Sequence, residues 1–168
     1  MADAERHLNW EGCWNARDLG GLPTAGGGTT RRGALIRADC LGKLTAAGRR
    51  ALFDYGVRTV VDLRGPLELA QDPPAFPGGR PDEPNFVNVP LDHQDPAAAP
   101  LWAAIRTRAD VYRLFLDFYP HALADGLRAI ATAPPGGVTF HCLGGTDRTG
   151  LVAAAPLRLA GVPDEAIA

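Results

Sequence analysis

The sequence predicts an α/β fold, a single domain with a short central sheet, mostly parallel, flanked by helices. Two apolar stretches carry this prediction. Residues 57–63 form an apolar, β-branched run typical of a buried strand. Residues 138–141 form a second such run, which continues through a glycine loop into a helix that begins at Arg148. Because open α/β sheets bind ligands at the carboxyl ends of their strands, we expect the functional site on the loop after residue 141.

The composition indicates one domain over residues 1–168 with a sizeable core. Of the 168 residues 46% are hydrophobic and 21% charged, and the net charge is −2 with both signs interspersed, which argues against a nucleic-acid partner. No apolar run approaches the roughly 20 residues of a membrane span, and the N-terminus lacks the apolar core of a signal peptide. The three cysteines have no metal-like spacing. We therefore expect a cytoplasmic protein that needs no metal and no other cofactor.

The first half of the chain is expected to alternate turns with short elements. Leu8, Trp10 and Trp14 are predicted to anchor an irregular N-terminal lead to the body of the domain. A hairpin region, a strand, a helix capped by Thr45, and the strand already described follow at residues 26–33, 34–37, 46–55 and 57–63. The proline- and glycine-rich residues 71–84 predict a surface loop.

The second half is expected to be mainly helical. A short strand is predicted at 85–89, and helices at 101–108, 110–130 and 148–159, the first of them lid-like and the last ending at Gly161. Asp110 is expected to cap the long helix, and Pro120 to kink it. Residues 163–168 begin a further helix.

Cys142 and Arg148 bracket a five-residue loop suited to phosphate binding. Such a loop lets backbone N–H groups turn inward and form an anion nest closed by a helix N-terminus. A thiol at its base is expected to ionise readily and to act as a nucleophile. Arg148 offers a planar fork for two phosphoryl oxygens, and the Thr149 hydroxyl assists the sulfur as a leaving group. The predicted phosphate-binding residues are Leu143, Gly144, Gly145, Thr146, Asp147 and Arg148.

The stretch His-Cys-Leu-Gly-Gly-Thr-Asp-Arg-Thr-Gly, residues 141–150, resembles the signature loop of the cysteine-dependent protein tyrosine phosphatases, in the form found in bacterial atypical tyrosine and lipid phosphatases. Residues 15–21, Asn-Ala-Arg-Asp-Leu-Gly-Gly, are similar to a second motif of this group. The alternative for the first stretch is a glycine-rich turn with a buried, inert cysteine. For the second it is a polar turn tied by Asn and Asp side chains.

Shorter matches to the same bacterial group lie between these two motifs. Arg37 and Asp39 match its Arg-x-Asp, and Asp62-Leu63-Arg64 with Glu68 matches a further segment. From spacing alone, Arg64 and Glu68 are predicted to form an i, i+4 ion pair in preference to contacting substrate. The resemblance implies a tyrosine-phosphatase-like catalytic domain. Because the family continues with at least one more helical segment, it also indicates a chain truncated at the C-terminus or an unusually short member.

The resemblance implies a general acid, for which there are three aspartates. Asp92 lies in a loop after a strand and before a long helix, where the superfamily carries its acid, and is preferred. Asp62 ends a strand, so it is either an acid or a partner of Arg64. Asp147 lies within the loop and is as suited to bracing Arg148 as to donating a proton. Asp92 and Asp62 therefore join Cys142, Arg148 and Thr149 as expected catalytic residues.

The resemblance implies phosphomonoester hydrolysis through a phosphocysteine, by a protein tyrosine or dual-specificity phosphatase. The partner is then a phosphorylated protein or a small phosphomonoester, and the oligomeric state is left open. Alternatives are a phosphatase of metabolite or phosphoinositide phosphates, an inactive phosphate-binding module, and a redox sensor. Thr146 stands where members with lipid activity commonly have Lys, which argues against a highly anionic substrate.

Overall fold

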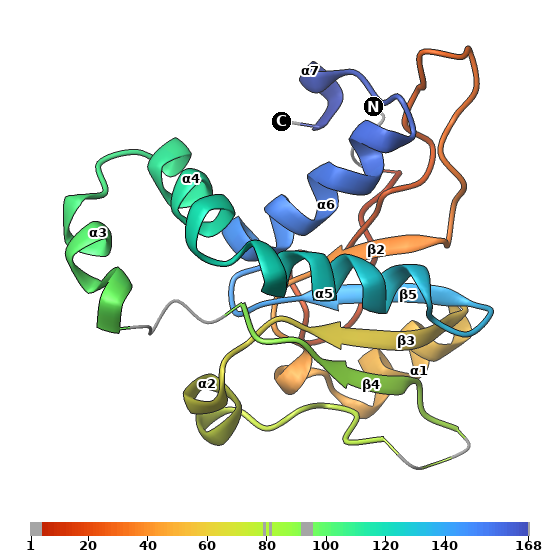
Figure 1. Cartoon of the computed structure of the whole chain (residues 1–168). Coiled ribbons are helices and arrows are strands. Elements are labelled where there is room, and N and C mark those ends of the chain that lie inside the picture. The colour runs from red at the N-terminus through yellow and green to blue at the C-terminus, as the bar shows by residue number, and fades with distance from the viewer. Residues whose placement is uncertain (1–4, 79, 81, 92–95, 168) are drawn as a thin grey trace.

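A computed structural model describes residues 5–78, 80, 82–91 and 96–167 of the chain. Its centre is a five-stranded sheet in the order β1-β2-β5-β3-β4. The strands are β1 (Arg17–Asp18), β2 (Leu35–Ala38), β3 (Val57–Asp62), β4 (Asn85–Asn88) and β5 (Gly137–His141). All neighbouring pairs are parallel except β1 and β2. The predicted α/β class and its mostly parallel sheet are therefore confirmed (Figure 1).

Helices cover both faces of the sheet. They are α1 (Ala46–Asp54), α2 (Pro66–Gln71), α3 (Ala99–Ala104), α4 (Arg108–Phe118), α5 (Pro120–Ala131), α6 (Asp147–Leu159) and α7 (Asp164–Ile167), with short 3₁₀ turns at Leu41–Lys43 and Pro96–Ala98. Figure 1 shows α5 in front of the sheet and α1 behind it. Both faces are therefore buried, which explains why β3 and β5 are apolar almost throughout.

The two faces form two separate hydrophobic cores. Val61 on β3 and Phe140 on β5 pack with Val152 of α6 in one core. The adjacent Val60 points to the other face and packs with Leu52 of α1. Consecutive strand residues thus serve opposite cores, as the period-2 geometry of a strand requires. The carboxyl end of β5, between β2 and β3, is held from both sides.

Several local predictions are confirmed and others are wrong. The Thr45 hydroxyl accepts a hydrogen bond from the Gly48 amide and caps α1. Trp10 is buried, but Trp14 is 81% exposed and anchors nothing. Thr107, not Asp110, is the N-cap of α4, and the Asp110 carboxylate bonds back to the Thr107 amide in a capping box.

Another wrong prediction concerns Pro120. Its predicted kink is a break, because α4 ends at Phe118 and Pro120 is the first residue of α5. Proline is favoured at a first helical position, where its missing N–H leaves no hydrogen bond unmade. The helix expected over residues 101–108 is α3, which begins at Ala99 and already ends at Ala104, and Arg108 belongs to α4. Within the described ranges, no helix has the length and apolar character that a membrane crossing needs.

Candidate active site

The loop between β5 and α6 begins with Cys142, which is buried with 3% exposure. Gly145 turns the loop with a φ of +65°, a conformation that side-chain-bearing residues rarely adopt. A Cβ atom at this position would lie 2.5 Å from the carbonyl oxygen of Ala38 on β2. Both the turn and the close approach to β2 therefore require glycine, and the local sequence determines the shape of the loop.

The carbonyl groups of the loop are held from outside. Arg37 Nη2 donates to the Gly145 oxygen at 2.6 Å. The Cys40 amide donates to the Leu143 oxygen at 2.9 Å, and Asn15 Nδ2 to the Gly144 oxygen at 3.3 Å. The amides of residues 143–146, by contrast, donate to no group in the described part of the chain. The bonds to the carbonyls fix the loop, and the amides without an acceptor are available to an anion, as expected of a nest.

The N-terminal motif, residues 15–21, also contributes to this arrangement through Asn15. The Asp39 carboxylate accepts hydrogen bonds from the amides of Trp14 and Asn15, at 3.1 and 3.0 Å. The side chain of Arg17 donates to Asn15 Oδ1 at 2.8 Å. The motif is therefore a tied polar loop, and through Asn15 it also positions the phosphate loop. Burial and the hydrogen bond to Asp39 raise the pKa of the Cys13 thiol, which acts as a protonated donor.

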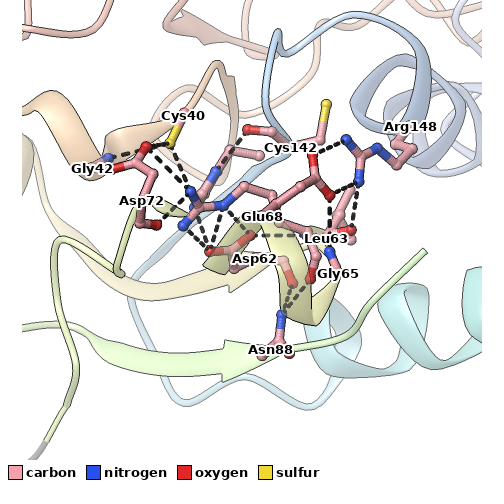
Figure 2. A network of polar contacts seen from close by, with 12 residues as sticks. Cys40, Gly42, Asp62, Leu63, Gly65, Glu68, Asp72, Asn88, Cys142 and Arg148 are labelled. Carbon is pink, nitrogen blue, oxygen red and sulfur yellow. Dashed lines mark hydrogen bonds and ion pairs between the residues drawn. The ribbon is translucent and has the colours of Figure 1, made fainter. Parts of the chain in front are cut away.

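Arg148, in the first turn of α6, is held by Glu68 of α2. Its Nη1 and Nη2 atoms each donate to one oxygen of the Glu68 carboxylate at 2.6 Å, and Nη1 also reaches the Leu63 oxygen at 3.4 Å (Figure 2). Burial lowers the pKa of Arg148, but the hydrogen bonds and charge of Glu68 and the charge of Cys142 outweigh it and raise the pKa overall. The guanidinium is therefore a permanent, oriented cation beside the loop.

The edge of the guanidinium that Glu68 does not occupy is the useful one. An arginine has five N–H donors in a rigid fork. Glu68 and Leu63 take both hydrogens of Nη1 and one of Nη2. Nε and the second hydrogen of Nη2 donate to no group in the described ranges. These two parallel donors fit two oxygens of a phosphoryl group. Figure 2 shows the Cys142 sulfur on the same side of the network as this guanidinium.

The predicted ion pair between Arg64 and Glu68 is wrong. Arg64 instead donates to Asp62 at 2.7 Å and to Asp72 at 3.4 Å. Arg64 precedes Gly65, the N-cap of α2, whereas Glu68 is the third helical residue and turns back to the Gly65 amide at 3.0 Å. The i, i+4 rule applies only when both residues lie on the same helix, so it does not cover this pair.

Asp62 is completely buried beneath the loop. Its carboxylate bonds to Arg64 Nε and Nη2 and lies 3.5 Å from His141 Nε2. Burial lowers the pKa of His141, so this histidine is neutral. A carboxylate enclosed in this way is shielded from solvent, which favours the second of the two roles expected for Asp62, as the partner of Arg64.

The other two candidate acids differ in what can be said of them. Asp92 lies outside the described residues. Asp147 is at the rim of the loop, where its side chain is 43% exposed and forms an ion pair with Arg108 at 3.4 Å. Of the two candidate acids that the structure describes, Asp147 is exposed to solvent beside the nest and Asp62 is buried.

Thr149 lies on α6 directly after Arg148 and is completely buried. Its hydroxyl oxygen has no hydrogen-bond partner within the described part of the protein. A buried hydroxyl without a partner is costly, and a catalytic role is one of the explanations for such a group. The described residues contain no group of three or more His, Cys, Asp or Glu side chains able to hold a metal ion.

Sequence reasoning missed the residues that hold the site together. The carboxylate of Glu68 accepts hydrogen bonds from Arg148, although the two residues are 80 positions apart in the sequence. No local spacing could indicate this contact. Arg37 and Asn15 did belong to recognised motifs, but their contact with the loop carbonyls depends on the order of the strands. In the folded sheet β2 pairs with β5, and β1 pairs with β2 on its other side.

The fold and site together define a class. A buried cysteine after a central parallel strand, a loop of unpaired amides and a carboxylate-held arginine at a helix start are the parts of a cysteine-based phosphate loop. Over residues 8–168, the chain matches the model of a family described as the tyrosine phosphatase family. The protein belongs to this family.

Similar proteins come from several bacteria. A Cupriavidus necator protein, named provisionally as a tyrosine-protein phosphatase, is 34% identical over 91% of this chain and 57% of its own. A tyrosine-protein phosphatase of Nostoc commune is 33% identical over 77% of this chain and 44% of its own. The triple specificity protein phosphatase PtpB of Mycobacterium tuberculosis is 29% identical over 93% of this chain and 64% of its own. The chain therefore spans about half to two thirds of the length of these relatives.

Proposed function

We propose that the protein hydrolyses phosphomonoesters through a phosphocysteine intermediate. One observation carries the proposal: Cys142 and the oriented guanidinium of Arg148 bracket amides that have no partner in the described chain. Together they offer a nucleophile and several donors to one phosphoryl group. An inert buried cysteine in a glycine turn would not need a bidentate carboxylate to orient a neighbouring arginine.

The reaction has two displacements at phosphorus. The Cys142 thiolate forms a bond to phosphorus as the bond to the ester oxygen breaks, and an acid protonates the departing oxygen. The loop amides and Arg148 hold the three phosphoryl oxygens, whose charge grows in the transition state. Water then attacks the phosphorus of the phosphocysteine, and the conjugate base of the acid takes a proton from this water. The P–S bond breaks, which releases inorganic phosphate and restores the Cys142 thiolate. The unpartnered hydroxyl of Thr149 is suited to stabilise this leaving thiolate.

Asp92 and Asp147 are the candidates for the acid. The case for Asp92 rests on its position in the sequence, in a loop before a long helix. The case for Asp147 rests on the structure, in which its side chain is 43% exposed at the rim of the loop.

The substrate we propose is a phosphoprotein, dephosphorylated at tyrosine alone or, by a dual-specificity enzyme, at serine and threonine as well. The names of the relatives support this proposal. A metabolite or phosphoinositide phosphate is the alternative. With Thr146 in place of the lysine of lipid-active members, we expect aryl phosphates to be better substrates than multiply phosphorylated inositides. A thiolate nucleophile requires a reducing compartment, which supports the cytoplasm as its location.

The test is hydrolysis of an aryl phosphate in the presence of a metal chelator, with and without vanadate. Turnover that vanadate inhibits is expected, since charge stabilisation is assigned to Arg148 and the amides. Phosphate binding without turnover would instead identify a phosphate-binding module.

A further inference from the structure

Within the described ranges, three large apolar side chains are exposed on the segments that form the candidate active site. These side chains, the apolar rim, are Trp14, Leu67 and Leu143, with exposed fractions of 81, 60 and 55%. Leaving apolar surface in water costs free energy. Single exposed apolar side chains are common on proteins, but several on the segments around one site indicate a binding surface.

Two members of the apolar rim are next in the sequence to residues of the site. Leu143 directly follows Cys142 in the phosphate loop. Leu67 belongs to α2, which Figure 1 shows beyond the carboxyl ends of β3 and β4, and the next residue, Glu68, binds Arg148. Both side chains therefore lie on segments at the edge of the sheet where a phosphoryl group would bind.

Trp14 is fixed at the same edge by its backbone. Its amide donates to the Asp39 carboxylate, which follows the end of β2, at 3.1 Å, and its carbonyl oxygen accepts from His7 Nε2 at 3.3 Å. The next side chain, Asn15, donates to the Gly144 oxygen of the phosphate loop. An indole on a fixed backbone offers a large apolar contact surface at a low cost in conformational entropy.

A hollow of about 500 Å³ adjoins this tryptophan. Trp14 lines it together with residues 7 and 9–13. This volume is in the range of small-ligand sites, so the hollow can receive a side chain of a bound peptide. Trp14 thus borders a hollow on its own segment, while its neighbour Asn15 contacts the phosphate loop.

We propose that the apolar rim determines substrate specificity by binding apolar side chains that flank the phosphorylated residue of a phosphoprotein. The inference rests on the proposed function, because a peptide whose phosphoryl group enters the nest passes over the residues around it. Trp14 and the hollow beside it take one flanking side chain, and Leu67 and Leu143 add further apolar contacts. A small metabolite phosphate has no such flanking groups and gains nothing from the rim.

A membrane surface is the other occupant that exposed tryptophan and leucine side chains suit. Segments that bind anionic lipid surfaces combine apolar side chains with lysine or arginine. None of the residues directly before or after Trp14, Leu67 and Leu143 in the sequence is Lys or Arg. The charge around the apolar rim therefore favours a peptide over a lipid surface.

Two phosphotyrosyl peptides test the proposal, identical except that either leucines or asparagines flank the phosphotyrosine. The wild type should have a kcat/KM about tenfold higher for the leucine peptide, the order expected for one well-packed aromatic contact. Trp14→Ala should remove most of this preference and leave kcat/KM for a small aryl phosphate, which has no flanking residues, at the wild-type value. Phe118→Ala, which truncates an exposed aromatic side chain at the last residue of α4, is the matched control and should keep the preference.

Dissociation constants of the two peptides are measured with Cys142→Ser, so that binding is followed without turnover. This variant should bind the leucine peptide more tightly, and the same variant with Trp14→Ala should bind both peptides equally. Equal kcat/KM and equal dissociation constants for the two peptides, or a preference that Trp14→Ala leaves unchanged, would overturn the proposal. Equal peptide binding together with binding to phosphatidylserine-containing vesicles that Trp14→Ala removes would identify a lipid surface instead. A binding preference without hydrolysis of any substrate would support the apolar rim and contradict the proposed hydrolysis.

Discussion

Glu68→Gln tests whether the carboxylate on α2 orients Arg148, the arginine proposed to bind the phosphoryl group. The substitution keeps the shape of the side chain but removes its charge and replaces one acceptor by an NH₂ group. Both partners of this ion pair are nearly buried, at 8 and 14% side-chain exposure, so solvent screens the interaction little. A hydrogen bond to a charged group contributes about 1.5–3 kcal/mol. Without one of its two hydrogen bonds to Glu68, the Arg148 guanidinium can turn away from the position proposed for the phosphoryl group.

If this free energy is expressed in the transition state, kcat/KM for an aryl phosphate falls about 10–100-fold, at 1.4 kcal/mol per factor of ten. The assay compares kcat/KM with the free energy of unfolding measured by urea. Asp54→Asn is the matched control, because it breaks the exposed ion pair with Arg50 on α1 and should change neither quantity by much. Glu68→Gln that loses stability but keeps wild-type kcat/KM would refute the idea that Glu68 orients Arg148 for catalysis.

Three further predictions concern the site. Arg148→Lys should lower turnover at least ~10²-fold, because a point charge cannot replace two parallel donors, and unchanged kinetics would place the site elsewhere. Either Asp147→Asn or Asp92→Asn should slow an alkyl phosphate more than an activated aryl phosphate, and the variant with this leaving-group dependence identifies the acid. Burial and the hydrogen bond to Asp72 raise the pKa of Cys40 to about 11, so iodoacetamide at neutral pH should label Cys142 and spare Cys40; equal labelling would contradict this.

Local patterns predicted most of the secondary-structure elements and the position of the loop that begins at Cys142. The run at 57–63 and the strand–loop–helix around Cys142 were found because burial on both sheet faces leaves an unbroken apolar stretch in the sequence. Thr45 was found because a cap acts on its own helix. Trp14 was misplaced, since an aromatic residue in an irregular segment has no periodicity to show which way it faces.

Long-range polar contacts could not be predicted in this way. Arg64 and Glu68 have the spacing of an ion pair, but the helix begins between them and each finds another partner. Arg37 likewise reaches the Gly145 carbonyl, 108 residues away, because β2 and β5 are neighbours in the sheet. Such contacts follow from topology rather than from any local sequence pattern.

The central claim is that Cys142 carries the phosphoryl group during turnover. Its most direct measurement is rapid acid quench of the enzyme during hydrolysis of an aryl phosphate, followed by mass spectrometry of the peptide that contains Cys142. The account predicts phosphate on the sulfur of Cys142 in the wild type, and neither this adduct nor turnover in Cys142→Ser. Steady turnover by Cys142→Ser at the wild-type rate would contradict it.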